Sequence, residues 1–198
     1  MAISIEDIKR LRELTGVGMT DAKQALDAAN GDFDAALKEM RKKGMTKAEK
    51  RGEREARQGL IGTYNHDGRI GVIVEVNCET DFVAHNEIFT DLVKDVAMHI
   101  AASSPQYVSS DDIPAADRDA KKQELLVSDS LAGKPEEMKD KIVEGQLSKY
   151  FAELCLLEQP FIKNPDITVG DYVKSHNARL GENIVVRRFN RIALGEVA

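Results

Sequence analysis

The side chains that could carry out acid–base, nucleophilic or metal chemistry are present but do not form a recognised motif. The four histidines lie far apart in the 198-residue chain, at His66, His85, His99 and His176. Neither the HExxH pattern of zinc proteases nor the GxSxG pattern of serine hydrolases occurs. The sequence alone does not test for a catalytic triad whose members come together only in the folded protein. We therefore expect a binding protein that is not an enzyme.

The sequence also has no complete glycine-rich motif for binding the phosphates of a nucleotide. The chain has no GxxxxGKS or GxxxxGKT sequence, which P-loop nucleotide binding requires. Gly16 and Gly18 match the start of a GxGxxG motif, but the third glycine and the preceding strand are missing. We predict that these two glycines form a turn between helices, and we expect no bound cofactor.

The two cysteines, Cys78 and Cys155, also favour a structural role. Two cysteines are too few for a disulfide framework or a four-cysteine zinc site, and they are typical of a reducing cytoplasm. Cys78 has the same strand parity as Val74 and Val76, so we predict that it lies in the core. We predict that His99 lies on the solvated side of its helix, and we expect no metal site.

Composition narrows the class of partner. The formal net charge of −6 argues against a general nucleic-acid binder, which needs many lysines and arginines. The N-terminus has no long apolar run typical of a signal peptide, and no stretch approaches the roughly 20 apolar residues of a membrane helix. We expect a cytoplasmic globular protein that has no membrane partner.

Residues 1–46 are predicted to form a small bundle of three helices. Ser4 and Asp7 have capping spacing at the start of the first helix. Thr20 is predicted to cap the second helix and Asn30-Gly31 to end it, because glycine tolerates a left-handed conformation, and Asp32 is predicted to cap the third. The residues that repeat at helical spacing, and that we predict to be buried, are Ile5, Ile8, Leu11 and Leu14, then Ala22, Ala25, Leu26 and Ala29, then Phe33, Ala36, Leu37 and Met40.

Residues 47–58 are predicted to form a charged connector. The wider segment from Lys38 to Arg57 contains nine Lys or Arg residues against four Asp or Glu residues. One interpretation is a solvated connector, which the interspersed acids favour. The other is a basic face that binds ribosomal RNA together with Arg187, Arg188 and Arg191.

Residues 59–198 are predicted to form an α+β core with a small three-stranded antiparallel sheet packed by helices. The runs 60–65 and 69–77 alternate and flank Asp67-Gly68, which is typical of a β-hairpin. Residues 183–194 are predicted to be the third strand. Helices are predicted between Asn86 and Ser103, over 117–127, from Pro135, and between Thr168 and Gly181. The helix that starts at Pro135 is predicted to bury Met138, Ile142, Leu147, Tyr150, Phe151, Leu154 and Leu157.

Three stretches carry a resemblance to a known family. They are LRELTGVGM at 11–19, VNCETDFVA at 76–84 and GENIVVRRF at 181–189, and they lie in this order over nearly the whole chain. Together they are similar to the elongation factor Ts family, in its short bacterial form. The resemblance implies a cytoplasmic factor in translation elongation, and so in protein biosynthesis. It also implies guanine-nucleotide exchange on elongation factor Tu through protein–protein interaction.

The resemblance also implies two groups of site residues. The N-terminal bundle resembles a ubiquitin-associated domain and would dock on the GTPase through its 15–20 loop, with Arg12, Met19 and Lys23 as contacts. The second group would insert between helices of elongation factor Tu, disturb its Mg²⁺ site and loosen GDP. This group consists of Thr80, Asp81, Phe82 and Val83.

The residues alone leave several points open. Phe82 is equally consistent with a core aromatic after a strand and with an exposed side chain on a loop, and the resemblance favours the loop. Met19 either fills the bundle or is exposed beside Gly18. His85 departs from the family, which usually has Arg or Lys there, and its charge depends on pH. The middle region, residues 108–136, carries no resemblance.

Two further possibilities concern the whole chain. A ubiquitin-associated-type module could be attached to an unrelated enzymatic domain, which a convergent active-site pocket would support. The resemblance to short family members favours a homodimer, although the sequence shows no interface.

Overall fold

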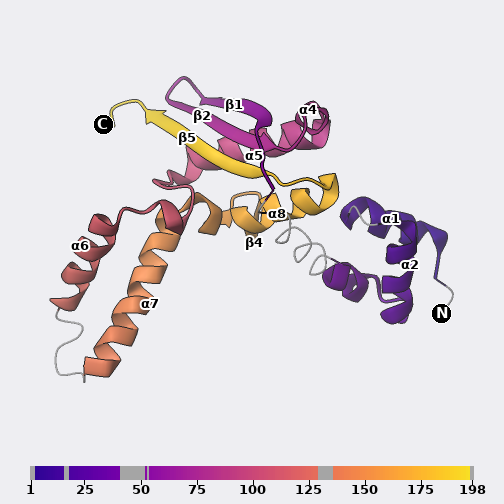
Figure 1. Ribbon diagram of the computed structural model, residues 1–198, viewed down its shortest axis with the longest axis horizontal. Coiled ribbons are helices and arrows are strands. Elements are labelled where there is room, and N and C mark those ends of the chain that lie inside the picture. Colours follow the sequence, from indigo (N-terminus) through magenta and orange to yellow (C-terminus); the bar gives the residue numbers. More distant parts are fainter. Residues whose placement is uncertain (1–2, 16–17, 41–51, 53, 129–135, 197–198) are drawn as a thin grey trace. The chain divides into compact units, whose positions relative to one another are not determined.

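The computed structural model describes residues 3–15, 18–40, 52, 54–128 and 136–196 (Figure 1). The chain divides into two compact units, one made of residues 1–101 and 171–198 and the other of residues 102–170. The predicted boundary at residue 46 lies outside the described ranges. The division into 1–46, 47–58 and 59–198 therefore stays a prediction.

In its described residues the N-terminal bundle has three helical segments: α1 (Ile5–Thr15), α2 (Met19–Ala28) and a helix over residues 33–40. The caps predicted at Ser4 and Asp32 are confirmed, whereas the cap predicted at Thr20 is wrong, because α2 starts at Met19 and its N-cap is Gly18. The Asp7 N–H donates to Ser4 Oγ at 2.9 Å, and Asp32 Oδ1 accepts two backbone N–H groups at 3.0 Å each. Between the second and third helices, Asn30 and Gly31 have φ angles of 52° and 83°, the left-handed conformation that ends a helix.

The core of the bundle is smaller than the sequence pattern predicts. Its buried residues are Ile8, Leu11, Ala22, Ala25, Leu26, Ala36 and Met40. Ile5 and Leu14, which we predicted to be buried on α1, are 67% and 49% exposed. Three short helices enclose only a narrow seam, so α1 buries its central apolar positions and not those at its ends.

The sheet has three antiparallel strands in the order β1-β2-β5: β1 (Gln58–His66), β2 (Ile70–Cys78) and β5 (Val185–Ala193). The predicted hairpin, the third strand and the α+β class are confirmed. At the hairpin turn Asp67 and Gly68 have φ angles of 51° and 67°, and the Arg69 N–H donates to the His66 carbonyl at 2.9 Å. Asp and Gly are residues that tolerate these angles.

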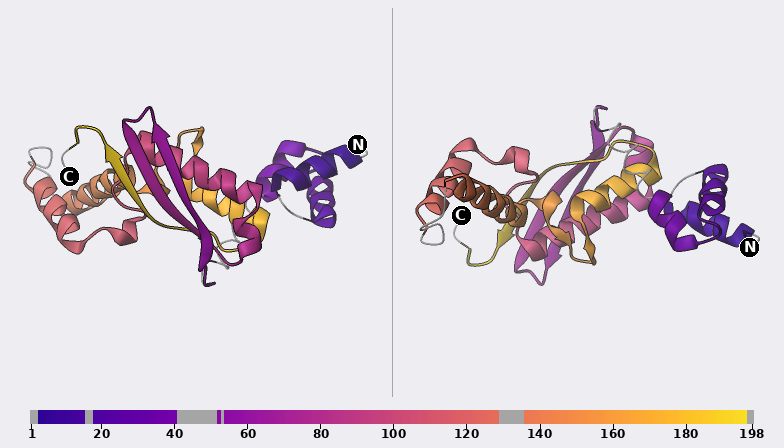
Figure 2. Two further views of the ribbon diagram at one scale, coloured as in Figure 1. Left: turned by 90° about the horizontal axis from the view of Figure 1, so that it is seen from above. Right: turned by 90° about the horizontal axis from the view of Figure 1, so that it is seen from below.

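One face of the sheet is covered by α5 (Glu87–Ser103) and α8 (Val169–Leu180), as Figure 2 shows from both sides. Val72, Val74, Val76 and Cys78 alternate along β2 and are all buried on this face. The buried residues of α5 are Phe89, Leu92, Val93, Val96, Ala97, His99, Ile100 and Ala101. The predicted core position of Cys78 is therefore confirmed.

The prediction that His99 is solvated is wrong, because this side chain is fully buried. The Tyr172 hydroxyl of α8 donates to Asp95 Oδ2 of α5 at 2.8 Å. Asp95 and His99 are four residues apart and so share a face of the helix. The side of α5 that the pattern assigns to solvent is therefore covered by a second helix.

The described residues of the second unit form two α-helices, α6 (Ala115–Leu126) and α7 (Glu136–Leu154), and two short 3-10 helices, η1 (Ser110–Asp112) and η3 (Leu156–Glu158). They also form a ribbon of two strands, β3 (Pro160–Phe161) and β4 (Asn164–Thr168). Helices α6 and α7 lie side by side (Figure 1). A buried cluster of Ile113, Phe151 and Cys155 holds this unit together. The predicted polar helix is confirmed as α6, whereas the sequence did not predict the β3–β4 ribbon.

The buried stripe predicted for α7 is partly wrong. Met138 and Tyr150 are 53% and 39% exposed, and Leu157 lies beyond the end of the helix, in η3. Val143, which the pattern omits, is fully buried. Within this unit α6 is the described helix paired with α7, and one partner helix covers only a narrow seam.

Candidate partner-binding site

A single helical turn, α4 (Asp81–Ala84), follows β2 and packs against β1 and β2. We predicted a loop here, and the structure instead has one turn of helix. Thr80 is its N-cap, with an extended backbone and a hydroxyl that accepts the Val83 N–H at 3.5 Å. Asp81 places a carboxylate in the first turn, where negative charge is favourable. Ala84 is buried and attaches the turn to the protein.

Phe82 lies on the outer side of this turn. Its side chain is 86% exposed, which excludes the core interpretation. Asp81 is exposed as well, while Val83 is half-buried. A large aromatic held in water gives nothing to the core, but it offers a partner much apolar area. The predicted group, Thr80 to Val83, therefore lies together on one exposed, capped turn.

Glu182, just before β5, is tied to the start of this turn. The Thr80 hydroxyl donates to Glu182 Oε1 at 2.5 Å. The Thr80 and Glu79 N–H groups donate to Glu182 Oε2 at 3.1 and 3.0 Å. Sequence reasoning missed Glu182 as a functional residue. The available signal was its place in the third resembling stretch, directly after the helix-ending Gly181.

The side chains near the turn include neither a reactive thiol nor a metal-binding group among the described residues. Burial raises the pKa of the Cys78 thiol to about 11, with the Glu182 carboxylate adding to the effect, and this thiol donates to the Thr80 carbonyl at 3.1 Å. Burial likewise raises the pKa of Cys155 to about 11. Thiols with these pKa values are protonated at neutral pH and are poor nucleophiles. Across the described ranges, no three His, Cys, Asp or Glu side chains group as a metal site.

The N-terminal bundle presents a second candidate surface. Arg12, Met19 and Lys23 are all exposed, with Met19 at 42% as the first residue of α2. The exposed alternative for Met19 therefore holds. The predicted 15–20 loop includes residues 16–17, which lie outside the described ranges. Leu14, which we assigned to the core, is 49% exposed and adds apolar area beside this loop.

Comparison with known proteins identifies the family. Residues 17–196 match the family model described as Elongation factor TS. The chain is 51% identical over 197 residues to the Elongation factor Ts of Alkaliphilus oremlandii, covering 99% of this chain and 91% of that protein. It is 50% identical to that of Syntrophus aciditrophicus and 48% identical to that of Thermodesulfovibrio yellowstonii, each covering 99% of this chain and 98% of the relative. The chain belongs to the elongation factor Ts family.

Membership of the elongation factor Ts family places the chain among translation elongation factors. It also agrees with the resemblance carried by the three sequence stretches. No helix in the described part of this elongation factor Ts chain is long and apolar enough to cross a membrane.

His85, where the resemblance predicts a departure from the family pattern, is the C-cap residue of α4. Its ring Nδ1 lies 2.7 Å from the Asp81 carbonyl oxygen, and its own N–H donates to the same oxygen at 3.1 Å. The exposed ring is therefore attached to the turn that carries Phe82.

Two arginines of the proposed RNA-binding face form ion pairs with glutamates of the same chain. Arg188 Nε donates to Glu75 Oε2 at 2.7 Å and thereby lowers the pKa of that carboxyl. Arg191 Nη1 donates to both oxygens of Glu196, at 2.9 and 2.8 Å, and its side chain is 12% exposed. Most of the Lys38–Arg57 segment lies outside the described ranges. These two ion pairs leave less positive charge for RNA.

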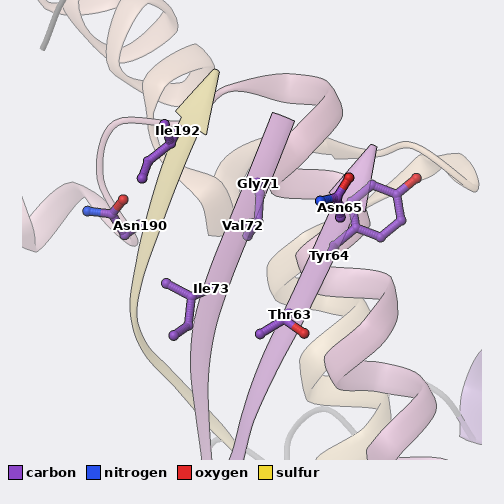
Figure 3. Close-up of a pocket in the computed structure, with 8 residues that line it drawn as sticks. All are labelled: Thr63, Tyr64, Asn65, Gly71, Val72, Ile73, Asn190 and Ile192. Carbon is purple, nitrogen blue, oxygen red and sulfur yellow. The ribbon is translucent and has the colours of Figure 1, made fainter. Parts of the chain in front are cut away.

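The open face of the sheet is the third exposed surface of this elongation factor Ts chain. Ile61, Ile73 and Ile192 are 57%, 49% and 71% exposed on it. Figure 3 shows Ile73 between Thr63 and Asn190, one residue from each strand. Beside this row Gly71 leaves open space where a side chain would stand, within a shallow depression of about 410 Å³.

Proposed function

We propose that this chain is a guanine-nucleotide exchange factor that binds the GDP complex of elongation factor Tu and promotes GDP release. Its membership of the elongation factor Ts family supports this function. The observation that carries the proposal is the 86% exposure of Phe82 on a short capped turn. The protein would act in the cytoplasm, where translation elongation takes place.

The proposed mechanism requires the Thr80–Val83 turn to enter the partner. Phe82 would lose its water and pack between helices of the GTPase, which is where its exposed apolar area would contribute binding free energy. The partner's Mg²⁺ bridges nucleotide phosphates and protein oxygens, so a shift of those oxygens weakens the hold on GDP. A turn that fits only the opened GTPase shifts the population towards the open state.

The chain itself performs no covalent step in this mechanism, so it is not an enzyme in the sense of making or breaking bonds. The N-terminal bundle would supply a second contact through Arg12, Met19 and Lys23. Two linked contacts raise the effective concentration of each for the partner. Exposed charges such as Arg12 and Lys23 chiefly speed encounter and select the partner.

Release of a fluorescent GDP analogue from elongation factor Tu tests the function. In an excess of unlabelled GDP, substoichiometric amounts of this chain should speed the replacement of all of the bound analogue, because an exchange factor turns over. A folded chain that leaves the release rate unchanged would contradict the proposal. Salt-dependent binding to ribosomal RNA in that case would favour the alternative function.

We also propose that two copies pair through the open face of the sheet. The exposed apolar side chains Ile61, Ile73 and Ile192 on one face of the sheet support this arrangement. Ile73→Glu places a charge at the centre of that face and should convert a dimer to a monomer in sedimentation velocity. A wild-type chain that sediments as a monomer at tens of micromolar would contradict the pairing.

A further inference from the structure

Three segments that are far apart in the sequence meet at the entrance to α4. The first precedes β1 and includes Gly52 and Arg54. The second, Glu79-Thr80, connects β2 to α4, and the third, Glu182-Asn183, connects α8 to β5. We call these six residues the clasp. All six are in the described part of the chain.

The second and third segments exchange backbone and carboxylate hydrogen bonds. The Glu182 carboxylate accepts the Glu79 N–H at 3.0 Å, the Thr80 N–H at 3.1 Å and the Thr80 hydroxyl at 2.5 Å. In the opposite direction, the Asn183 N–H donates to Glu79 Oε1 at 2.6 Å. Hydrogen bonds to an ionised acceptor are shorter and stronger than neutral ones. This reciprocal set therefore fixes the backbone at Glu79 and Thr80.

Asn183 adds the first segment to the clasp. Its side chain is buried, and its amide nitrogen donates to the carbonyls of Gly52 at 3.2 Å and Arg54 at 2.7 Å. Arg54 Nη1 also lies 3.6 Å from Glu79 Oε2. Glu79 is thus held from both sides. It has little freedom to move the start of α4.

The turn needs this external support because it is too short to be stable alone. A helix of one turn has not recovered the cost of its nucleation. Among the residues of α4, Ala84 is the buried one, so packing restrains the far end of the turn. The near end, at Thr80, is restrained by Glu182 and by the Cys78 thiol, which donates to its carbonyl.

We propose that Glu182 is the positioning residue for the exchange turn. Through Thr80 it sets the direction in which α4 presents Phe82, and it does not need to contact the partner itself. The expected effect of Glu182 on GDP release rests on the proposed exchange function. The structural part, that Glu182 orders α4, can be measured on the free protein.

The test variant is Glu182→Gln, which keeps the shape but replaces one acceptor oxygen with an NH₂ group that faces N–H donors. Amide hydrogen exchange measured by NMR should accelerate at Thr80, Val83, Ala84 and His85 and stay unchanged in β2 and α5. In the GDP-release assay we expect the maximal rate to fall between about tenfold and a hundredfold, the range that a misplaced functional group costs. The half-saturating concentration should change less, because docking by the N-terminal bundle is retained.

The matched control is Glu196→Gln, which removes another carboxylate of the same unit. Glu196 pairs with the Arg191 guanidinium at 2.8 Å and makes no described bond to α4. This variant should leave the exchange of the α4 amides and the GDP-release rate as in wild type. If Glu182→Gln does not fold, Glu182→Asp takes its place, since it keeps the charge but withdraws the carboxylate by one methylene.

The outcomes separate the positioning role from the proposed function. Unchanged α4 amide exchange in the folded Glu182 variant would overturn the positioning role. Equal acceleration in α4, β2 and α5 would also overturn it, because Glu182 would then serve general stability. If wild type does not release GDP, the exchange function fails, while the amide measurement on the free protein still decides whether Glu182 orders the turn.

Discussion

Two phenylalanines seven residues apart have opposite environments in this protein. Phe89, on α5, is fully buried, whereas Phe82, on α4, is 86% exposed. Both follow the same strand, and both lie near the start of a helix. The difference comes from length: α5 continues for 17 residues and buries eight of them, while α4 ends after four.

The contrast separates two ways of holding a helix in place. Helix α5 is stabilised by apolar burial, which is non-directional and scales with area. Helix α4 is held at its start by the hydrogen bonds that Thr80 donates to the Glu182 carboxylate and at its end by the burial of Ala84. Directional bonds can present an apolar side chain to water, which burial cannot. This is how the fold can keep Phe82 available for a partner.

The largest effect is expected from Phe89→Ala. Removing a fully buried aromatic should lower the free energy of unfolding by about 3–5 kcal/mol, because the lost burial adds to the cavity left behind. Urea denaturation followed by circular dichroism measures this change. Phe82→Ala is the matched control and should change stability by no more than about 0.5 kcal/mol. A large loss of stability in both variants would remove the contrast.

A smaller loss of folding stability is expected as pH falls, because His176 is buried. Burial lowers the pKa of His176 on α8 below its ordinary value of 6.5, opposed in part by the hydrogen bond of its ring to the Tyr172 carbonyl. Below pH 6.5 this histidine becomes protonated in the unfolded chain, while His176 of the folded protein stays neutral. Stability should therefore be full above that pH and fall as pH drops towards the folded pKa, with a slope of at most about 1.4 kcal/mol per pH unit.

Urea denaturation between pH 7.5 and 5 measures this dependence. His176→Gln removes the titrating ring, and the difference between the two profiles isolates its share from that of the carboxylates. The wild-type profile should be the steeper of the two. Parallel profiles would mean that His176 titrates alike in the folded and unfolded states.

The smallest effect is expected on the exposed side, at Lys23→Glu. The exposed position of Lys23 predicts unchanged stability, and its proposed contact with elongation factor Tu predicts weaker binding by about twofold to fivefold, as for other exposed charges. Titration calorimetry at low and high salt would show this loss shrinking as salt is added. Lys38→Glu, on the third helix of the bundle, is the control. Equal affinities for both variants would remove Lys23 from the contact.

Local patterns were sufficient to predict the sheet and its main helix. Asp67-Gly68 indicates the hairpin, alternation along β2 indicates its buried face, and repeats of four residues indicate α5. These signals come from residues close together in the sequence. Helix ends such as Asn30-Gly31 and Asp32 were predictable for the same reason.

The failures involve a second element that the local pattern cannot see. His99 is buried because α8 covers α5, whereas Leu14 of α1 and Met138 of α7 are 49% and 53% exposed despite their place in an apolar repeat. Glu182 acts on Thr80 across about a hundred residues of sequence, a relation that spacing does not reveal. The exposure of Phe82 was undecided from its neighbours alone, and the family resemblance pointed to the correct alternative.

The central claim is that Phe82 serves the partner and not the core, and one paired measurement tests it. GDP release from elongation factor Tu is followed with wild type and with Phe82→Ala, after urea denaturation has established that both are equally stable. We expect fast catalytic release by wild type and a loss of about 30-fold or more in the variant, as for an interface residue worth at least 2 kcal/mol. Equal release by the two proteins would contradict the claim.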